Sequence, residues 1–160
     1  MGIGRTTHRA VAERAGVPLG ATTYYFPTLA DLVAAALERA HTDLGVELRR
    51  WADHLGDGTE LPARLTRLLC EYLGDRGRAL TEFELYLAAA RSPELRGLAV
   101  SWLGQVRQVL ARCVGDEAAR ALAILVDGVA LQHLATGEPV DPAAVEAAVA
   151  ALVDADRGAH

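Results

Sequence analysis

Residues 6–26, TTHRAVAERAGVPLGATTYYF, have the pattern of two short helices joined by a tight turn. Thr7 is placed to cap the first helix, and Gly16 stands where a residue in the left-handed conformation must end it. Pro18 suits the first turn of the second helix, where its missing N–H costs nothing, and Phe26 precedes a proline and is biased out of the helix. The pattern predicts a helix-turn-helix, and an ordinary corner between two helices is the alternative.

The charge of the chain is unevenly distributed. Its net charge is −5, which argues against nucleic-acid binding by the whole surface, because phosphate contacts require local positive charge. Residues 1–30 nevertheless contain Arg5, Arg9 and Arg14 against only Glu13. A mildly basic head on an acidic body is compatible with a small DNA-reading unit attached to a larger domain.

The composition is that of a globular protein, with 51% hydrophobic and 23% charged residues over 160 positions. No apolar run follows Met1, and the apolar stretch 118–135 is interrupted by Arg120 and Asp127. We therefore expect neither a signal peptide nor a membrane span, and a cytoplasmic location. The two cysteines lack redox or metal-binding spacing, which favours buried free thiols over a disulfide.

Apolar residues recur at spacings of three and four through the rest of the chain, which predicts an all-α fold. The expected helices span residues 29–55, 62–73, 78–90, 94–114, 116–135 and 142–155. The first of these follows Thr28, a capping residue, and carries one apolar stripe from the head into the body. We therefore expect two units, a helix-turn-helix in residues 1–28 and a helical body in residues 29–160, with the long helix joining them.

The last two expected helices carry more apolar surface than the chain itself provides cover for. Residues 116–135 are apolar nearly all round, and such a helix must be covered on both sides. Pairing with a second copy in a two-fold four-helix bundle would cover this surface, and packing within one chain is the alternative. The side chains expected at the dimer interface are Leu125, Gly128, Val129, Leu131, Val145, Val149 and Leu152.

Aromatic and polar residues with inward periodicity indicate a ligand cavity in the body, and a solid aromatic core is the alternative. The expected pocket residues are Trp51, Phe83, Glu84, Tyr86, Trp102, Gln105 and Gln132. No motif for a nucleophile, a phosphate-binding loop or a metalloprotease is present, and the histidines show no ligand spacing. We therefore expect no enzymatic activity, no metal and no cofactor.

The opening stretch also resembles the DNA-binding segment of the tetracycline-repressor (TetR) family of bacterial one-component regulators. The resemblance rests on Ala12, Ala15-Gly16-Val17-Pro18-Leu19-Gly20-Ala21, Tyr24-Tyr25-Phe26-Pro27 and Leu32. Residues 125–132 and 134–137 are similar to part of the two-helix element through which such proteins dimerise. The resemblance implies a homodimeric repressor that binds a palindromic double-stranded DNA operator and is released by a small-molecule inducer bound in its C-terminal domain.

Carried over position by position, the resemblance implies a DNA-contacting set in the head. Thr7 and the two tyrosines would contact phosphates, and Arg9 would be the best single donor to guanine. In the dimer, the two recognition helices would lie one DNA turn apart, roughly 34 Å. The expected DNA-binding residues are Thr7, Arg9, Leu19, Gly20, Ala21, Thr23, Tyr24 and Tyr25.

The chain departs from the family pattern in three places. Leu29 stands where members often carry a phosphate-contacting lysine, and Thr23 replaces a usual tyrosine. Because the chain begins at Met1, we expect the first helix of the family's DNA-binding domain to be absent and residues 1–28 to be an incomplete segment. The alternative function is therefore a ligand-binding or heterodimerising antagonist of the same fold that does not bind DNA.

Overall fold

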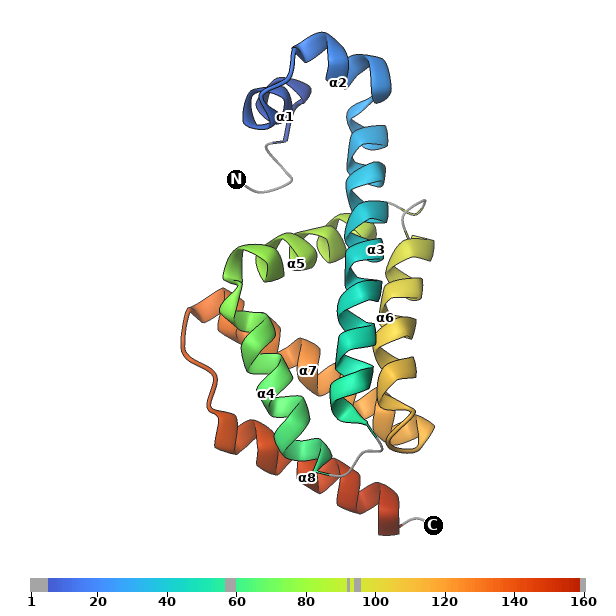
Figure 1. Ribbon diagram of the computed structural model, residues 1–160, viewed down its shortest axis with the longest axis vertical. Coiled ribbons are helices and arrows are strands. Elements are labelled where there is room, and N and C mark those ends of the chain that lie inside the picture. Colours follow the sequence, from blue (N-terminus) through green and yellow to red (C-terminus); the bar gives the residue numbers. More distant parts are fainter. Residues whose placement is uncertain (1–5, 57–59, 92, 94–95, 159–160) are drawn as a thin grey trace.

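The computed structural model describes residues 6–56, 60–91, 93 and 96–158, and within these ranges the regular structure is entirely α-helical. A short two-helix head stands at one end of a long helix, and the remaining helices form the body around the other end (Figure 1). The predicted all-α fold is confirmed. The helices are α1 (His8–Ala15), α2 (Leu19–Tyr25), α3 (Leu29–Leu55), α4 (Leu61–Gly74), α5 (Arg76–Arg91), α6 (Arg96–Leu110), α7 (Asp116–Thr136) and α8 (Pro142–Gly158).

Most helix bounds agree with the sequence to within a few residues, and α3 agrees at both ends. Helix α5 begins two residues earlier than expected, where Asp75 Oδ1 accepts the N–H of Arg78 at 3.1 Å. Helix α6 ends at Leu110, because the following residues form tighter turns. The expected start of that helix at residue 94, and the expected absence of a helix before the head, lie outside the described residues.

The head has the local geometry that the opening stretch predicts. Thr7 Oγ1 accepts the N–H of Ala10 at 3.1 Å and so caps α1. Gly16 ends α1 in the left-handed conformation, with φ of 67°, where a side chain would be strained. Pro18 differs from the expectation by one position, since it is the N-cap of α2 and the helix begins at the next residue.

Helix α3 joins the head to the body. Its start is fixed by a capping box, in which Thr28 Oγ1 accepts the N–H of Asp31 at 3.1 Å and Asp31 Oδ2 accepts the N–H of Thr28 at 2.9 Å. Further along, Leu37, Leu44 and Leu48 are buried on the stripe that packs with Trp102 of α6. Because the head continues directly into α3, a tilt of this helix moves the head (Figure 1).

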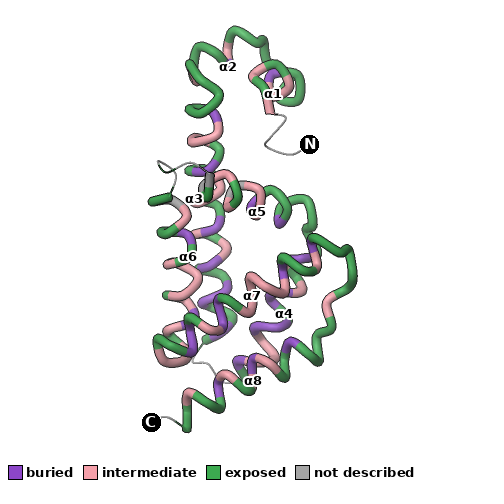
Figure 2. The backbone as a smooth tube through the Cα atoms, turned by 180° about the vertical axis from the view of Figure 1, so that it is seen from behind, coloured by how far each residue is buried: buried purple, intermediate pink, exposed green. Residues whose placement is uncertain are grey.

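The main core lies in the lower body, between α4, α7 and α8, with the end of α3 (Figure 2). Leu55, Leu65, Leu122 and Val149 are fully buried there. The head, in contrast, is exposed along most of its length, and Ala12 and Thr22 are its buried residues. The body therefore carries most of the stability that apolar burial supplies.

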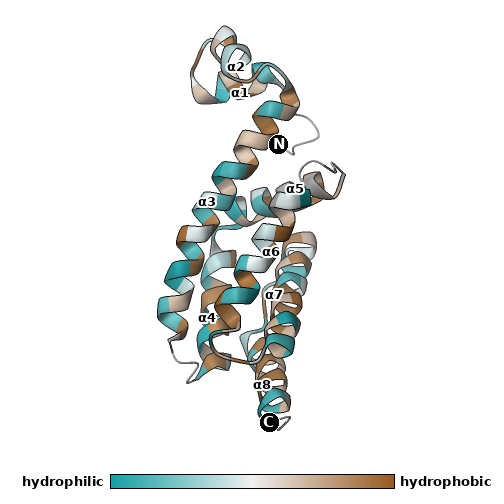
Figure 3. Ribbon diagram, turned by 90° about the vertical axis from the view of Figure 1, so that its right-hand side faces the viewer, coloured by the Kyte–Doolittle hydropathy of each residue, from teal (hydrophilic) through white to brown (hydrophobic). Residues whose placement is uncertain are grey.

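Helix α7 is long and apolar enough to cross a membrane by length and composition alone, a test that the core helix of a soluble protein also passes. Here it packs against α6 and α8, and Leu122, Ala130 and Leu134 are buried. Val145, Val149 and Val153 of α8 are buried against the rest of the body. Hydrophobic residues recur along both helices (Figure 3).

Two residues expected at the dimer interface are covered within the chain. Val145 is 7% exposed and Val149 is 0% exposed, because the apolar stripe of α8 packs on α4 and α7 of its own chain. This finding corrects the expectation that these two side chains face a partner. Leu131 is 54% exposed, and Leu125, Gly128, Val129 and Leu152 are partly exposed, so these five remain available to a second copy.

Candidate functional site

A small cavity lies in the upper body, where five helices meet. Its volume is about 50 Å³, and residues of α3, α4, α5, α6 and α7 line it. The cavity adjoins α3 directly, so a molecule bound in it would press on the helix that carries the head. The lining consists of Leu44, Glu47, Leu48, Trp51, Tyr72, Glu82, Phe83, Tyr86, Trp102, Val106, Val126, Asp127 and Ala130.

Aromatic rings form much of the wall. Trp51 meets Tyr72 edge to face, with 6.4 Å between the ring centroids. Tyr86 lies 5.2 Å from Trp102 and 5.9 Å from Phe83, again centroid to centroid. Such rings offer flat apolar surface together with electron-rich faces that attract cations.

The polar groups of the lining are acidic. Glu47, Glu82 and Asp127 contribute three carboxyl groups, and no basic side chain is found among the described residues that line the cavity. Glu82 is only 8% exposed, and its Oε2 accepts the hydroxyl proton of Tyr72 at 2.6 Å. Burial raises the pKa of Glu82, while the hydrogen bond from Tyr72 and the charge of Arg78 oppose that rise.

Asp127 and Tyr86 complete the polar part of the wall. Burial raises the pKa of Asp127 to about 6. The Tyr86 hydroxyl is buried, and it has no hydrogen-bond partner among the described residues. Burial and the nearby Asp127 raise the pKa of Tyr86, so its hydroxyl remains a neutral donor. A buried donor without a partner costs free energy, which a bound polar group would recover.

Asp127→Asn is expected to stabilise the protein at pH 7.5 and to have little effect near pH 4. Because the pKa of Asp127 rises from 3.8 to about 6 on folding, the folded state binds the proton more tightly than the unfolded state. The free energy of unfolding therefore falls as the pH rises between these two values and stays lowered above them. Urea unfolding from pH 4 to 7.5 measures the difference between the two proteins.

The control for this comparison is Asp53→Asn, which changes an exposed carboxylate of α3. It is expected to follow the wild-type pH profile. A loss of stability in the Asp127→Asn protein at pH 7.5 would contradict the account, since it would mean that the carboxylate makes a favourable native interaction.

The cavity brings together part of the predicted pocket. Trp51, Phe83, Tyr86 and Trp102 line it, and the two tryptophans are also core residues at 6% exposure. The other three predicted residues, Glu84, Gln105 and Gln132, are not among the described residues that line it. Gln105 Nε2 lies 2.8 Å from Nε2 of His41, and Gln132 lies on a separate groove.

Sequence reasoning missed Glu47, Tyr72, Glu82 and Asp127 as cavity residues. A signal existed for Asp127, because an acidic residue in the middle of an otherwise apolar helix requires a reason. For Glu47 and Tyr72, the periodicity of their helices gave no indication of which neighbouring helix would close over them.

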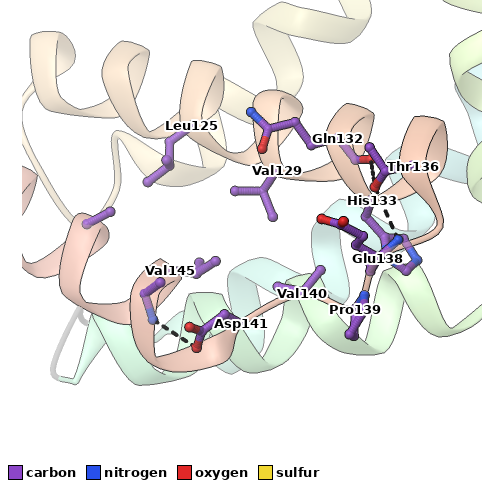
Figure 4. A pocket seen from close by; sticks show the side chains of 12 residues that line it. Leu125, Val129, Gln132, His133, Thr136, Glu138, Pro139, Val140, Asp141 and Val145 are labelled. Carbon is purple, nitrogen blue, oxygen red and sulfur yellow. Dashed lines mark hydrogen bonds between the residues drawn. The ribbon is translucent and has the colours of Figure 1, made fainter.

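A second, more open groove lies between α7 and α8 (Figure 4). Its volume is about 260 Å³, and Leu125, Val129 and Val145 contribute apolar side chains to its lining, which also includes Gln132. His133 has a partner there, since its Nδ1 lies 2.7 Å from the carbonyl oxygen of Glu138. Glu138 and Asp141 contribute carboxyl groups to the groove, but no phenylalanine, tyrosine or tryptophan is found among the described residues that line it.

The head presents a second candidate site, a DNA-reading face. Tyr24 is 80% exposed and Tyr25 72% exposed, with their rings edge to face. Thr7, Arg9, Leu19, Gly20 and Thr23 are also exposed, and Ala21 is partly exposed, so the predicted set of DNA-contacting residues is largely open to solvent. The Thr23 hydroxyl lies 3.3 Å from the carbonyl oxygen of Gly20 in its own helix.

Among the described residues, no group of three or more histidine, cysteine, aspartate or glutamate side chains is arranged to hold a metal ion. Cys70 and Cys113 are not joined by a disulfide, and both are half-buried rather than fully buried as expected. They lie on α4 and just after α6, away from the acidic groups of the cavity.

Comparisons with known proteins agree with this architecture. Residues 56–155 match the family model described as tetracyclin repressor-like, C-terminal domain. The chain is 40% identical to a TetR-family member, SCO1917 from Streptomyces coelicolor A3, with a TM-score of 0.81 over 95% of this chain and 88% of that one. No sequence among the curated proteins matches it.

Solved structures of the multidrug binding protein EbrR are also similar. The complex with ethidium shares 39% identity and a TM-score of 0.81, covering 94% of this chain and 88% of that one. The complex with malachite green shares 42% identity and a TM-score of 0.78 over the same shares of the two chains. The chain therefore belongs to the TetR family of transcriptional regulators, with a helical ligand-binding C-terminal domain.

Proposed function

We propose that this protein is a cytoplasmic, homodimeric transcriptional repressor that binds a palindromic operator and is released by an aromatic cation. The observation that carries the proposal is the composition of the cavity, in which five aromatic rings surround three carboxyl groups next to the helix that bears the head. Aromatic faces and desolvated carboxylates together favour flat or propeller-shaped organic cations over neutral or anionic molecules.

The relatives support this ligand class. EbrR is described as a multidrug binding protein, in complexes with proflavin, ethidium and malachite green. Each of these three dyes is an aromatic cation at neutral pH. The carboxyl groups and aromatic rings of this chain's own cavity favour the same class of ligand, and this argument does not depend on the sequence identity.

The test uses crystal violet, a triphenylmethane cation, and its leuco form, which has the same three rings without the charge. The protein is expected to bind crystal violet at micromolar or lower concentration, and to bind the leuco form at least about tenfold more weakly, because losing the charge removes about 1.4 kcal/mol or more of attraction. Isothermal titration calorimetry measures both affinities, since the leuco form is colourless. Equal affinity for the two forms would contradict a cation site, and the absence of binding by both would contradict the proposed ligand class.

Dimerisation is proposed through the outer faces of α7 and α8. Ile124 is 67% exposed and Leu131 is 54% exposed on one side of α7, with Gly128 between them. Large apolar side chains on a surface of this kind are typical of an interface, and a two-fold pair of these helices would form a four-helix bundle.

Leu131→Glu is expected to convert the dimer to a monomer, because two glutamates would be buried near the two-fold axis without partners. Light scattering after gel filtration measures the mass. Val100→Glu is the matched control, since Val100 is 64% exposed on α6 and lies away from the proposed face. A Leu131→Glu protein that stays dimeric would place the interface elsewhere.

The alternative is an antagonist of the same fold that binds the ligand and a partner but not DNA. The departure at Leu29 favours it, since family members often carry a phosphate-contacting lysine at that position. Such a protein would bind crystal violet and dimerise while leaving the mobility of every double-stranded DNA unchanged.

A further inference from the structure

Arg78 lies outside the cavity and contacts three side chains of its acidic wall. The guanidinium carbon of Arg78 lies 5.2 Å from the centroid of the Tyr72 ring. Its Nε lies 3.5 Å from Oε1 of Glu82, and its Nη1 lies 3.7 Å from Oε2 of Glu47. Those three contacted side chains line the cavity, whereas Arg78 is not one of the lining residues.

These contacts cross between helices. Glu47 belongs to α3, Tyr72 to α4, and Arg78 and Glu82 to α5. Among the described residues, the ion pair between Glu47 and Arg78 is the one that joins α3 to α5. Arg50 is the second cation near Glu47, with its Nη1 3.2 Å from Oε2 of Glu47. Because Arg50 also belongs to α3, this ion pair joins no two helices.

The cavity is too small for an aromatic cation in this state. A volume of about 50 Å³ holds one or two water molecules, whereas small-molecule sites occupy about 300–1,000 Å³. A ligand must therefore separate the helices that line the cavity. Its positive charge would also lie close to Arg78, which competes with it for Glu47 and Glu82.

We propose that Arg78 is an internal counter-cation that latches α3 to α5, and that the bound ligand replaces it. In the ligand-free state Arg78 neutralises Glu47 and Glu82 and holds the linker helix in the position that suits DNA binding. The ligand cation takes over both carboxylates, Arg78 turns out to water, and α3 is freed from α5. The Arg78 side chain is already 40% exposed, so it borders the solvent into which it would turn.

This inference rests on the proposed function, since it assumes a cationic ligand in the cavity. The latch lowers the apparent affinity for the ligand, because only molecules with an open latch can bind it. The apparent affinity is the intrinsic affinity multiplied by the fraction of such molecules. By linkage, the same latch couples the ligand to the operator, so that each weakens the binding of the other.

Arg78→Gln tests the latch. The variant is expected to bind crystal violet about tenfold more tightly than the wild type, because the dye no longer has to break the contact between α3 and α5. Its operator affinity is expected to change less on adding dye than that of the wild type, because α3 is already free. Arg50→Gln is the matched control, since it removes a cation from the same carboxylate without breaking a contact between helices, and it is expected to behave as the wild type does.

Glu47→Gln breaks the latch from the α3 side. It too is expected to lose the coupling between dye and operator, but to bind crystal violet more weakly, because a cavity carboxylate is lost. An Arg78→Gln protein that binds the dye equally or more weakly, or an Arg50→Gln protein that matches it, would overturn the latch while leaving the proposed function intact. A wild-type protein that binds no aromatic cation would overturn both.

Discussion

Glu82→Gln combined with Asp127→Asn is expected to weaken the binding of crystal violet by about 100-fold or more. Removing one partner of a desolvated charge pair costs about 2 kcal/mol or more, and each 1.4 kcal/mol is a factor of ten. Both carboxyl groups line the cavity and are shielded from water. Dye fluorescence titrations of the variant and the wild type measure the loss.

The neutral leuco form makes this prediction specific. The affinity of the double variant for the leuco form is expected to stay close to that of the wild type, because the amide side chains keep the shape of the cavity. The variant therefore loses its preference for the cation but keeps its pocket. Asp53→Asn with Glu71→Gln is the matched control, since both carboxylates are exposed and line no part of the cavity. A double variant that retained its preference for the cation would show that the charge recognition lies elsewhere.

Arg9→Ala is expected to weaken operator binding by about 10- to 100-fold, because a bidentate contact with guanine is worth about 1–3 kcal/mol. Arg9 lies exposed on α1, where it is open to DNA. The operator is first selected by the wild-type protein from random double-stranded DNA, and affinities are then measured at several salt concentrations. The affinity of the wild type is expected to fall steeply with salt.

Arg67→Ala controls for the loss of one positive charge, since Arg67 is exposed on α4 in the body. Its operator affinity is expected to match that of the wild type. If Arg9→Ala had no larger effect than Arg67→Ala, the head would not read bases through α1. If no DNA were selected at all, the antagonist function would replace the repressor.

The head could be predicted from the sequence because its structure is decided locally. The cap at Thr7 and the left-handed stop at Gly16 each depend on a side chain, or the lack of one, within a few residues. The same holds for the start of α3, where Thr28 and Asp31 satisfy each other. Helix bounds set in this way need no knowledge of the rest of the fold.

The cavity could be predicted only in part, because its wall comes from five separate helices. The aromatic members Trp51, Phe83, Tyr86 and Trp102 were predicted from their large apolar surface, which must be buried somewhere. The acidic members depend on which helices pack together, and Glu82 looks in the sequence like a surface residue two positions from Glu84. Glu82 is held by the Tyr72 hydroxyl from α4 and by Arg78, four residues earlier in its own helix.

The stripe of α8 illustrates a further limit. Periodicity identifies Val145 and Val149 as one apolar face, but it does not say whether that face packs on the same chain or on a partner. In the structure they pack within the chain. On α7, the apolar side chains that stay exposed, including Ile124, lie on the face opposite its buried residues.

The central claim is that an aromatic cation in the acidic cavity releases the protein from DNA. The most direct measurement is the fluorescence anisotropy of a labelled operator bound by the protein, titrated with crystal violet and with its leuco form. Crystal violet is expected to release the wild-type protein, and the leuco form is not. The Glu82→Gln/Asp127→Asn double variant is expected to stay bound in both titrations. Equal release by both dye forms, or release of that variant at the wild-type dye concentration, would contradict the central claim.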